Sequence, residues 1–243
     1  MTSIWLLLTI LICTVQGQFQ DICQAGVCDC QGENTTTILV VKCVCDKRTQ
    51  ELILNSGLLA KLPFINRFTV QDCNDLVLTK DSFKYARQLQ VLSIKRTRNV
   101  TLAMGVFSSL NSLNIEDVDY LRFQPGSFMG ASGVATISIH RSFISELPIF
   151  ALYNMTGLRT FELDNVNLGN VKSQSLHLQM DNYQSRFTMT NCTIAQLAIR
   201  CRWVDEQERG PSVHVHVHVL SSKHVPERSC EMGQQFAESN NVL

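Results

Sequence analysis

Four cysteines near the N-terminus come nearest, by type and spacing, to a metal site. They are Cys28, Cys30, Cys43 and Cys45. Four thiolates at such positions could hold a tetrahedral zinc ion. Zinc sites of this kind, however, favour a C-x2-C spacing and a reducing compartment, whereas these cysteines form two C-x-C pairs. We therefore expect disulfides here, and we expect no metal ion and no cofactor.

Paired carboxylates are the second set that could support chemistry, because one carboxyl group can act as an acid while another acts as a base. Glu116 is followed by Asp117, and one residue separates Glu162 from Asp164. Parallel β-helix enzymes that cut polysaccharides also use acidic residues on stacked coils, but they lack the regular repeat and the cysteine-rich start described below. The sequence contains no G-x-S-x-G, H-E-x-x-H or phosphate-binding glycine motif. We expect that the protein is not an enzyme.

The N-terminal residues, 1–17, have the pattern of a secretory signal peptide. An apolar run extends from Ile4 to Val15 and is followed by small or polar residues. This run is shorter than the roughly 20 apolar residues of a membrane-spanning helix, and no later segment comes close. Lys+Arg and Asp+Glu are balanced at 21 each, so the net charge does not indicate nucleic acid. We expect a secreted, extracellular protein that does not insert into a membrane after signal removal.

Glycosylation motifs and the cysteine content agree with secretion. Sequons of the form N-x-[ST] begin at Asn34, Asn99, Asn154 and Asn191. The chain has ten cysteines, and Cys13 falls within the signal peptide, so nine remain. In an oxidising compartment most of these should pair. The odd number leaves at least one thiol that is free, paired between chains or part of a segment that does not fold.

An internal repeat is the strongest pattern in the sequence. An apolar-x-x-apolar-x-apolar core occurs six times, although Gln184 replaces the first apolar residue of the last copy. Its fourth position lies at Phe68, Leu92, Leu113, Ile137, Phe161 and Phe187. Successive repeats are therefore 24, 21, 24, 24 and 26 residues apart. The alternation predicts a short strand with one buried face, and the apolar residues that follow, such as Val166 and Leu168, would turn inward. No single unit can bury so much apolar surface, so the units must stack as a solenoid.

This spacing resembles the L-x-x-L-x-L-x-x-N/C-x-L pattern of extracellular leucine-rich repeat proteins. Those repeats also carry an aromatic residue in their second half, as at Phe83, Phe107, Phe128 and Phe150, and we expect these rings to return to the interior on the far side of the coil. The resemblance covers roughly residues 23 to 201. It implies an α/β-type solenoid, a curved arc of about six repeats over residues 65–201, with short parallel strands on its concave side and irregular or 3-10 segments on its convex side.

The ninth position of the repeat departs from the family pattern, in which Asn is frequent. Here it is Cys73, Thr97, Val118, Ser142, Val166 and Cys192. Without the Asn side chain, the amide groups of the turns must find other partners.

The cysteine-rich start, in residues 18–64, resembles the N-terminal cap of the same family and includes the first strand. The stretch "CQAGVCDCQGENTTTILVVKC" has the spacing C-x4-C-x-C-x12-C. The resemblance implies that Cys23 pairs with Cys30 and Cys28 with Cys43. Two interpretations of Cys45 and Cys73 remain. Either they form a further disulfide with each other, or Cys73 is an unpaired cysteine buried as a small hydrophobic residue. Cys192 and Cys201 are candidates to close a small loop at the end of the array.

Residues 202–243 lack the repeat, and we expect a low-complexity, mostly disordered tail. Within it, "SVHVHVHVL" would place His214, His216 and His218 on one face of a strand, where three imidazoles could bind a metal. We favour the simpler interpretation that a short nucleotide repeat encodes this alternation. Cys230 would then be the odd thiol.

The concave strand face is the candidate binding site, because solenoids of this type usually bind protein ligands there. The side chains expected to contact a partner are Arg67, Gln71, Ser93, Lys95, Asn114, Glu116, Ser138, His140, Glu162, Asp164, Arg186 and Thr188. Basic residues come early in this set and acidic residues later, so a partner of opposite polarity would be steered to it. We expect binding of an extracellular protein or receptor in recognition, adhesion or signalling.

Two other functions agree with the same sequence. The protein could be a structural component of extracellular matrix or cuticle, in which glycans and the odd cysteine mediate assembly. It could also be a truncated, soluble form of a leucine-rich repeat receptor. The sequence predicts no particular oligomeric state.

Overall fold

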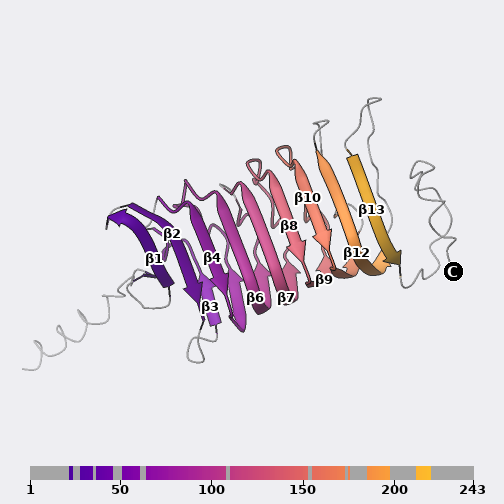
Figure 1. Cartoon of the computed structure of the whole chain (residues 1–243), viewed down its shortest axis with the longest axis horizontal. Helices are drawn as coiled ribbons and strands as arrows, with labels where there is room; N and C mark the ends of the chain where they lie inside the picture. The colour runs from indigo at the N-terminus through magenta and orange to yellow at the C-terminus, as the bar shows by residue number, and fades with distance from the viewer. Residues whose placement is uncertain are drawn as a thin grey trace, which may run out of the picture.

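The chain folds as a β-solenoid of about six turns in the computed structural model, which confirms the predicted stacking of repeats (Figure 1). The structure describes residues 22–23, 28–34, 37–45, 51–60, 64–107, 110–152, 155–172, 175, 185–197 and 212–219. Within these ranges there is no helix, and so none that is long and apolar enough to cross a membrane. Each turn consists of a strand, a sharp corner, a second strand and a return loop.

The first strands of the turns form a parallel sheet, which we call the front sheet. It contains β2 (Thr37–Val44), β4 (Arg67–Gln71), the first half of β6 (Val91–Leu102), the first half of β7 (Ser112–Phe123), β8 (Thr136–His140), β10 (Thr160–Asp164) and the first half of β12 (Arg186–Leu197). The register aligns equivalent repeat positions, so that Phe161 lies between Ile137 and Phe187. The repeat of about 24 residues predicted from the sequence therefore corresponds to the step from one strand of the front sheet to the next.

The second strands of the turns form another parallel array, the second sheet. It contains β3 (Glu51–Leu54), β5 (Asp75–Leu78), β9 (Phe143–Leu147), β11 (Asn167–Val171) and the second halves of β6, β7 and β12. This differs from the irregular or 3-10 segments that we expected on that side. The reason is visible in stretches such as "DLVL" and "YLRF", where apolar residues recur at every second position and satisfy a half-buried strand.

The corner between the two sheets depends on one residue per turn in the left-handed backbone region. These residues are Asp72, Arg96, Asp117, Arg141, Asn165 and Asn191, with φ between 45° and 61°. Asp and Asn tolerate this conformation, whereas Arg pays a steric cost of about 1–2 kcal/mol. Because each corner falls at the same repeat position, the six residues stack as a column along the edge of the solenoid.

The ninth repeat position follows each corner and points inward. Ser142 donates its hydroxyl to the carbonyl of His140 at 2.7 Å and accepts the backbone N–H of Val118 at 3.1 Å. Thr97 likewise donates to the carbonyl of Lys95 at 3.1 Å. Short hydroxyl side chains thus take over hydrogen bonds at corners where the family pattern has Asn.

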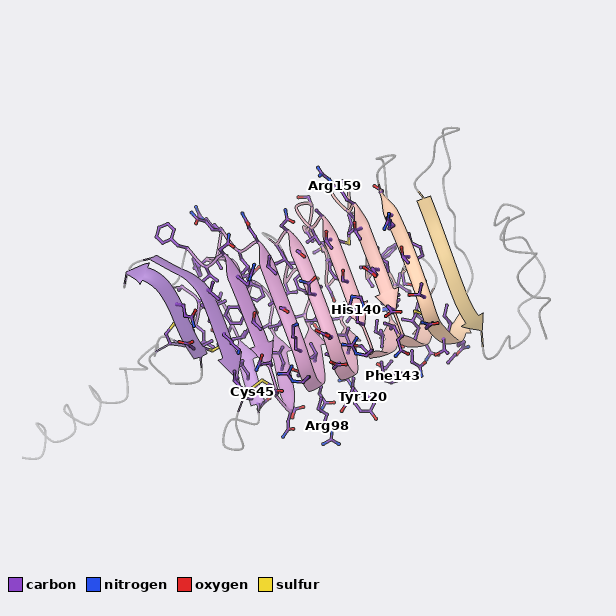
Figure 2. All side chains as sticks on the ribbon, viewed as in Figure 1. Cys45, Arg98, Tyr120, His140, Phe143 and Arg159 are labelled. Atoms are coloured by element: carbon purple, nitrogen blue, oxygen red, sulfur yellow. A yellow bond between two sulfur atoms is a disulfide. The ribbon has the colours of Figure 1, made fainter. Side chains whose placement is uncertain are left out.

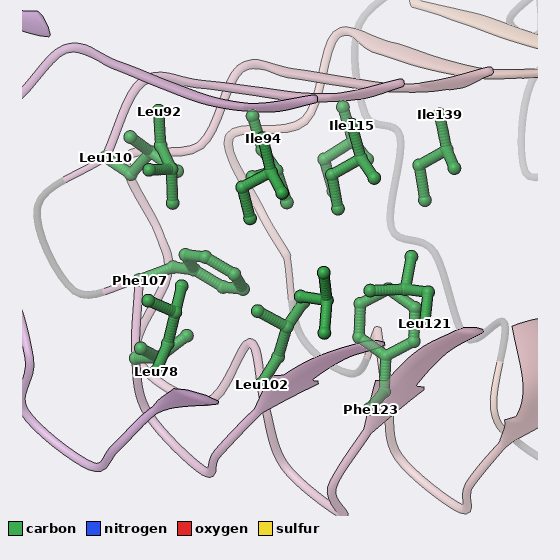
Figure 3. Packing of buried hydrophobic residues seen from close by; sticks show 14 of the residues in the cluster. Leu78, Leu92, Ile94, Leu102, Phe107, Leu110, Ile115, Leu121, Phe123 and Ile139 are labelled. Atoms are coloured by element: carbon green, nitrogen blue, oxygen red, sulfur yellow. The ribbon is translucent and has the colours of Figure 1, made fainter. Parts of the chain in front are cut away.

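The apolar interior lies between the two sheets and is closed on its third side by the return loops. Figure 3 shows Ile94 and Ile115 of the front sheet facing Leu102 and Leu121 of the second sheet, with Phe107 entering from a loop. Of the four expected loop aromatics, Phe83, Phe107 and Phe128 are buried. Phe150 was wrongly expected inside: its side chain is 45% exposed, and the neighbouring Ala151 and Leu152 are buried instead.

A disulfide-linked hairpin covers the N-terminal end of the solenoid. β1 (Cys28–Asn34) pairs antiparallel with β2, the only antiparallel pairing among the described strands. Disulfides join Cys23 to Cys30 and Cys28 to Cys43, the two pairings that the family resemblance implied. The hairpin therefore shields core residues such as Val41 that the first turn would otherwise expose.

A strand also continues the front sheet at the C-terminal end, inside the segment that we expected to be mostly disordered. β13 (Ser212–Val219) pairs parallel with β12, beside it in Figure 1. The backbone register sets four valines opposite four buried residues of β12: Val213 opposite Phe187, Val215 opposite Met189, Val217 opposite Cys192 and Val219 opposite Ile194. The alternation of His and Val thus has the period that this sheet position requires.

Candidate functional site

The twelve side chains expected to contact a partner lie on one surface, the outward face of the front sheet. They alternate along each strand with buried residues, as in β10, where Glu162 lies between buried Phe161 and Leu163. All are exposed or half-buried except Ser93, which is 8% exposed. Figure 2 shows this face with His140 near its middle. The parallel register therefore brings residues from six turns into continuous rows.

The rows follow the ladder of the sheet. The central row contains Thr69, Ser93, Asn114, Ser138, Glu162 and Thr188. The row next to the corner contains Gln71, Lys95, Glu116, His140, Asp164 and Thr190. Neighbours within a row are separated by one strand spacing, about 4.8 Å. Lys95, Glu116 and Asp164 thus lie beside the corner, and the central row is made of small polar side chains apart from Glu162.

Charges in the N-terminal half of this face neutralise one another. Lys95 Nζ lies 2.9 Å from Glu116 Oε2, and Arg96 forms two bonds to Asp72, at 2.7 and 3.0 Å. The bond from Lys95, followed by that from Arg141, lowers the pKa of Glu116 below its ordinary value. The bond from Arg96 lowers the pKa of Asp72 in the same way. Of the residues that we expected to steer a partner, Lys95 and Glu116 are thus engaged with each other, whereas Arg67 has no ion-pair partner among the described residues.

Arg141 extends this network to the next turns. Its guanidinium contacts Asp117 Oδ1 at 2.7 Å and also binds Glu116. Both carboxylates raise the pKa of Arg141, so it stays charged at any physiological pH. Lys95, Glu116, Asp117 and Arg141 therefore form one ion-pair cluster across three turns, and their charges are paired within the chain.

The C-terminal half of the face contains a small pocket. It has a volume of about 320 Å³ and is lined by Thr160, Glu162, Arg186 and Thr188. Neither Glu162 nor Arg186 has an ion-pair partner among the described residues. Three of these four residues were predicted to contact a partner. The pocket therefore combines accessible charge of both signs with two hydroxyl groups.

Asp164 borders this pocket on the corner side. It accepts a hydrogen bond from Thr190 Oγ1 at 2.7 Å, and His140 Nδ1 lies 3.8 Å from its other carboxylate oxygen. These contacts hold Asp164 in place at the edge of the pocket.

A second surface, which sequence reasoning missed, is an open groove behind the corner on the C-terminal half of the solenoid. We call it the corner groove; it is lined by residues including Arg98, Tyr120, Arg141, Phe143, Asn167 and Asn191. Tyr120 and Phe143 pack edge to face with ring centroids 5.6 Å apart, and Tyr120 is 53% exposed. Figure 2 shows Arg98, Tyr120 and Phe143 along the same edge. The signal was available in "VDYLRF", whose alternation directs Tyr120 outward.

The four sequons have different environments. Asn191 is exposed at the last corner, with φ of 51°. Asn99 is half-buried and donates its side-chain amide to Asp75 at 2.8 Å. Asn34 lies in β1, and its side chain is not among those described. Asn154 lies outside the described residues. Asn191 is therefore the most accessible described sequon.

Cysteines that could have held zinc are used in disulfides instead. Cys28, Cys30 and Cys43 belong to the two bridges of the N-terminal hairpin, and Cys45 is bonded to Cys73. Of the two interpretations of Cys73, the structure therefore shows the disulfide and not the unpaired buried residue. This bond joins the end of β2 to the first corner. None of the four candidate cysteines retains a thiolate for a metal ion.

Cys192 carries a free thiol and is buried at the ninth position of the last turn. It contacts the carbonyls of Leu163 and Thr190 at 3.5 and 3.3 Å. Burial raises the pKa of this thiol, so it is a poor nucleophile. Cys201, which we considered as its partner, and Cys230 lie outside the described residues, and the side chains of His214, His216 and His218 are not described either.

Comparison with known proteins adds no identification. A search against models of protein families finds no match, and a search of curated proteins finds no similar sequence.

Proposed function

We propose that this chain is a secreted leucine-rich repeat protein that binds an extracellular protein through the outward face of its front sheet. The observation that carries the proposal is the set of continuous polar rows on that face, built from six turns in register. A solenoid presents such a surface without a separate binding domain, since neighbouring turns supply neighbouring contacts. The three disulfides agree with an oxidising, extracellular environment.

The repeat step of about 24 residues and the cysteine-rich N-terminal hairpin support the leucine-rich repeat assignment. Two strands per turn can be accommodated in such a repeat if the second strand replaces the irregular segment of the family pattern. The assignment therefore rests on the spacing of the first strand and the cap, rather than on the form of the second side.

Partner contacts are centred on the pocket formed by Thr160, Glu162, Arg186 and Thr188. Glu162 and Arg186 have no ion-pair partner among the described residues, so they can pair across an interface, and such pairs are worth more when the interface desolvates them. The cluster around Lys95 and Glu116 would first have to break its own ion pairs. We therefore propose the C-terminal half of the face, and not the N-terminal half, as the binding region. Of the twelve residues expected to contact a partner, Glu162, Arg186 and Thr188 lie in its pocket.

The test is a pull-down from extracellular fluid and cell surfaces with the purified full chain, followed by titration of the captured partner. Glu162→Lys and Arg186→Glu should each weaken saturable binding at least tenfold, since removal of one member of a desolvated charge pair costs about 2–5 kcal/mol. The matched control is Lys95→Gln, which breaks an ion pair away from the pocket, and it should leave affinity within about threefold. No saturable partner, or equal affinity for all variants, would contradict the proposal.

A matrix role through an intermolecular disulfide would need a cysteine other than Cys192, because that thiol is buried. Electrophoresis of the secreted protein without reducing agent distinguishes the two functions. A monomer that binds its partner supports recognition, whereas reducible oligomers support assembly.

A further inference from the structure

We propose that an N-linked glycan on Asn191 folds back into the corner groove and covers the rings of Phe143 and Tyr120. The proposal concerns a surface separate from the front face and stands without the proposed function. It rests on three observations: Asn191 itself lines the groove, two aromatic side chains that pack together line it as well, and so do the amide side chains of Asn165 and Asn167.

The attachment point is well placed for this contact. Asn191 and Thr193 belong to one sequon, and both line the groove. Thr193 pairs with Asn167, and Asn167 pairs in turn with Phe143. Two strand spacings, about 10 Å in total, therefore separate the sequon from the Phe143 ring along the second sheet. The first sugars of an N-linked glycan can span this distance without leaving the protein surface.

The chemistry of the groove matches that of an N-acetylglucosamine unit. A pyranose ring has an apolar face of C–H groups and a rim of hydroxyl groups, and binding sites combine an apolar wall with a few placed polar groups. Here Tyr120 and Phe143 supply the wall, crossing at 85°. Asn165, Asn167 and Arg98 are exposed around it and can donate or accept hydrogen bonds with the rim.

Tethering makes a weak contact sufficient. A ligand attached by a short flexible link has an effective concentration of order mM at a nearby site. At this effective concentration, a weak contact between the sugar and the aromatic rings is formed in a large share of the molecules. The same sugar free in solution would bind poorly. The attached glycan is therefore a better occupant of this groove than a sugar from another molecule.

The Asn99 sequon lacks these features and provides the matched control. Its side chain is half-buried and bonded to Asp75, and Asn99 does not line the groove. Asn99 pairs with Tyr120 in the second sheet, so a glycan there would begin one strand spacing from that ring, on its N-terminal side. Removal of the Asn99 sequon therefore tests whether the ring contacts come from the Asn191 glycan, and it should leave them unchanged.

The experiment uses the full chain secreted from a host that attaches high-mannose glycans. Glycopeptide mass spectrometry should show Asn191 occupied. Nuclear Overhauser contacts should join the acetamide methyl and ring protons of ¹³C-labelled sugar to the Phe143 and Tyr120 rings. Trimming the folded glycoprotein to a single N-acetylglucosamine should speed hydrogen exchange of backbone amides at 118–122 and 143–145 at least fivefold. Asn99→Gln should keep the contacts, and Phe143→Ala should abolish them.

Three results would overturn the proposal. The first is an unoccupied Asn191. The second is an occupied Asn191 that makes no contact with the rings and whose trimming leaves exchange unchanged. The third is binding of free N,N′-diacetylchitobiose to the intact glycoprotein with shifts at Phe143, because this would show an open groove that takes a foreign glycan. Trimming acts on protein that has already folded, so failure of a variant to fold cannot mask the outcome.

Discussion

Arg141 and Asp117 are 24 residues apart in the chain, yet Arg141 Nε lies 2.7 Å from Asp117 Oδ1. Both residues occupy the left-handed corner position of consecutive turns, with φ of 45° and 55°. Arg96 and Asp72 repeat the arrangement one pair earlier, at the same distance of 2.7 Å. The first four residues of the corner column therefore alternate acid and base, although the left-handed backbone conformation disfavours Arg.

Replacement of Arg141 should separate backbone strain from ion pairing. Arg141→Asn loses exposed ion pairs, which contribute little to stability, but relieves a left-handed Arg. We expect the free energy of unfolding to stay within about 1 kcal/mol of wild type in urea titrations. Arg141→Val loses the same pairs and puts a β-branched residue at positive φ, so we expect a loss of about 2–3 kcal/mol. Equal losses for both variants would show that strain at this corner is unimportant.

Acid should destabilise the protein through the carboxylates of the same cluster. The pKa of Glu116 is lowered in the folded state by its bonds from Lys95 and Arg141. A carboxylate with a lowered folded pKa stabilises the fold above its unfolded pKa, and this contribution is lost as pH falls through the folded pKa. Urea titrations should show wild type losing stability below the ordinary value of 4.5. Glu116→Gln should show a shallower acid limb.

The control for the acid limb is Glu162→Gln, which changes a carboxylate on the same face that has no ion-pair partner among the described residues. Its pH profile should follow that of wild type. A parallel change in both variants would mean that the loss at low pH comes from the net charge of the protein and not from this cluster.

The strand register can be tested with two adjacent residues. Leu113 is fully buried, whereas Asn114 beside it faces outward. Leu113→Asp places an unpaired charge in the core at a cost of several kcal/mol, so we expect no secreted protein. Asn114→Asp should be secreted at wild-type level and unfold at nearly the same temperature. If the two outcomes were exchanged, the strand would be shifted by one residue.

The disulfide between Cys45 and Cys73 should be a major source of stability. It closes a separation of 28 residues, for which the chain-entropy relation gives about 3–4 kcal/mol. The double replacement Cys45→Ala with Cys73→Ala should lower the free energy of unfolding by that amount. Cys192→Ala is the control, because it removes a buried thiol that bonds to no other cysteine, and it should cost about 1 kcal/mol. Similar losses would indicate that burial, and not the cross-link, provides the stability.

β13 should be required to close the C-terminal end of the solenoid. A chain ending at residue 202 leaves the edge of β12 unpaired and its buried Phe187 and Met189 without a covering strand. We expect lower stability and concentration-dependent association in sedimentation measurements. A chain ending at residue 220 keeps β13 and should behave as the full-length protein. Identical behaviour of both truncations would mean that β13 does not protect this edge.

The sequence determined the repeat and the alternation within its first strand, because burial of every second side chain leaves a local record in the order of residues. Thus Phe161 and Leu163 were placed inward and Glu162 and Asp164 outward, as the structure has them. The spacing of the N-terminal cysteines, read by family resemblance, led to the same disulfides that the structure contains.

Only the tertiary structure decided which residues of different turns meet. A repeat step of about 24 residues does not predict that the chain turns a corner at a residue with left-handed backbone. The pairing of Arg141 with Asp117 could therefore not be predicted from the sequence. The same holds for the ring pair of Tyr120 and Phe143 and for the register of β13 against β12. These contacts depend on the angle of the corner and the stagger of adjacent turns, which arise when many weak side-chain contacts are satisfied together in the packed solenoid.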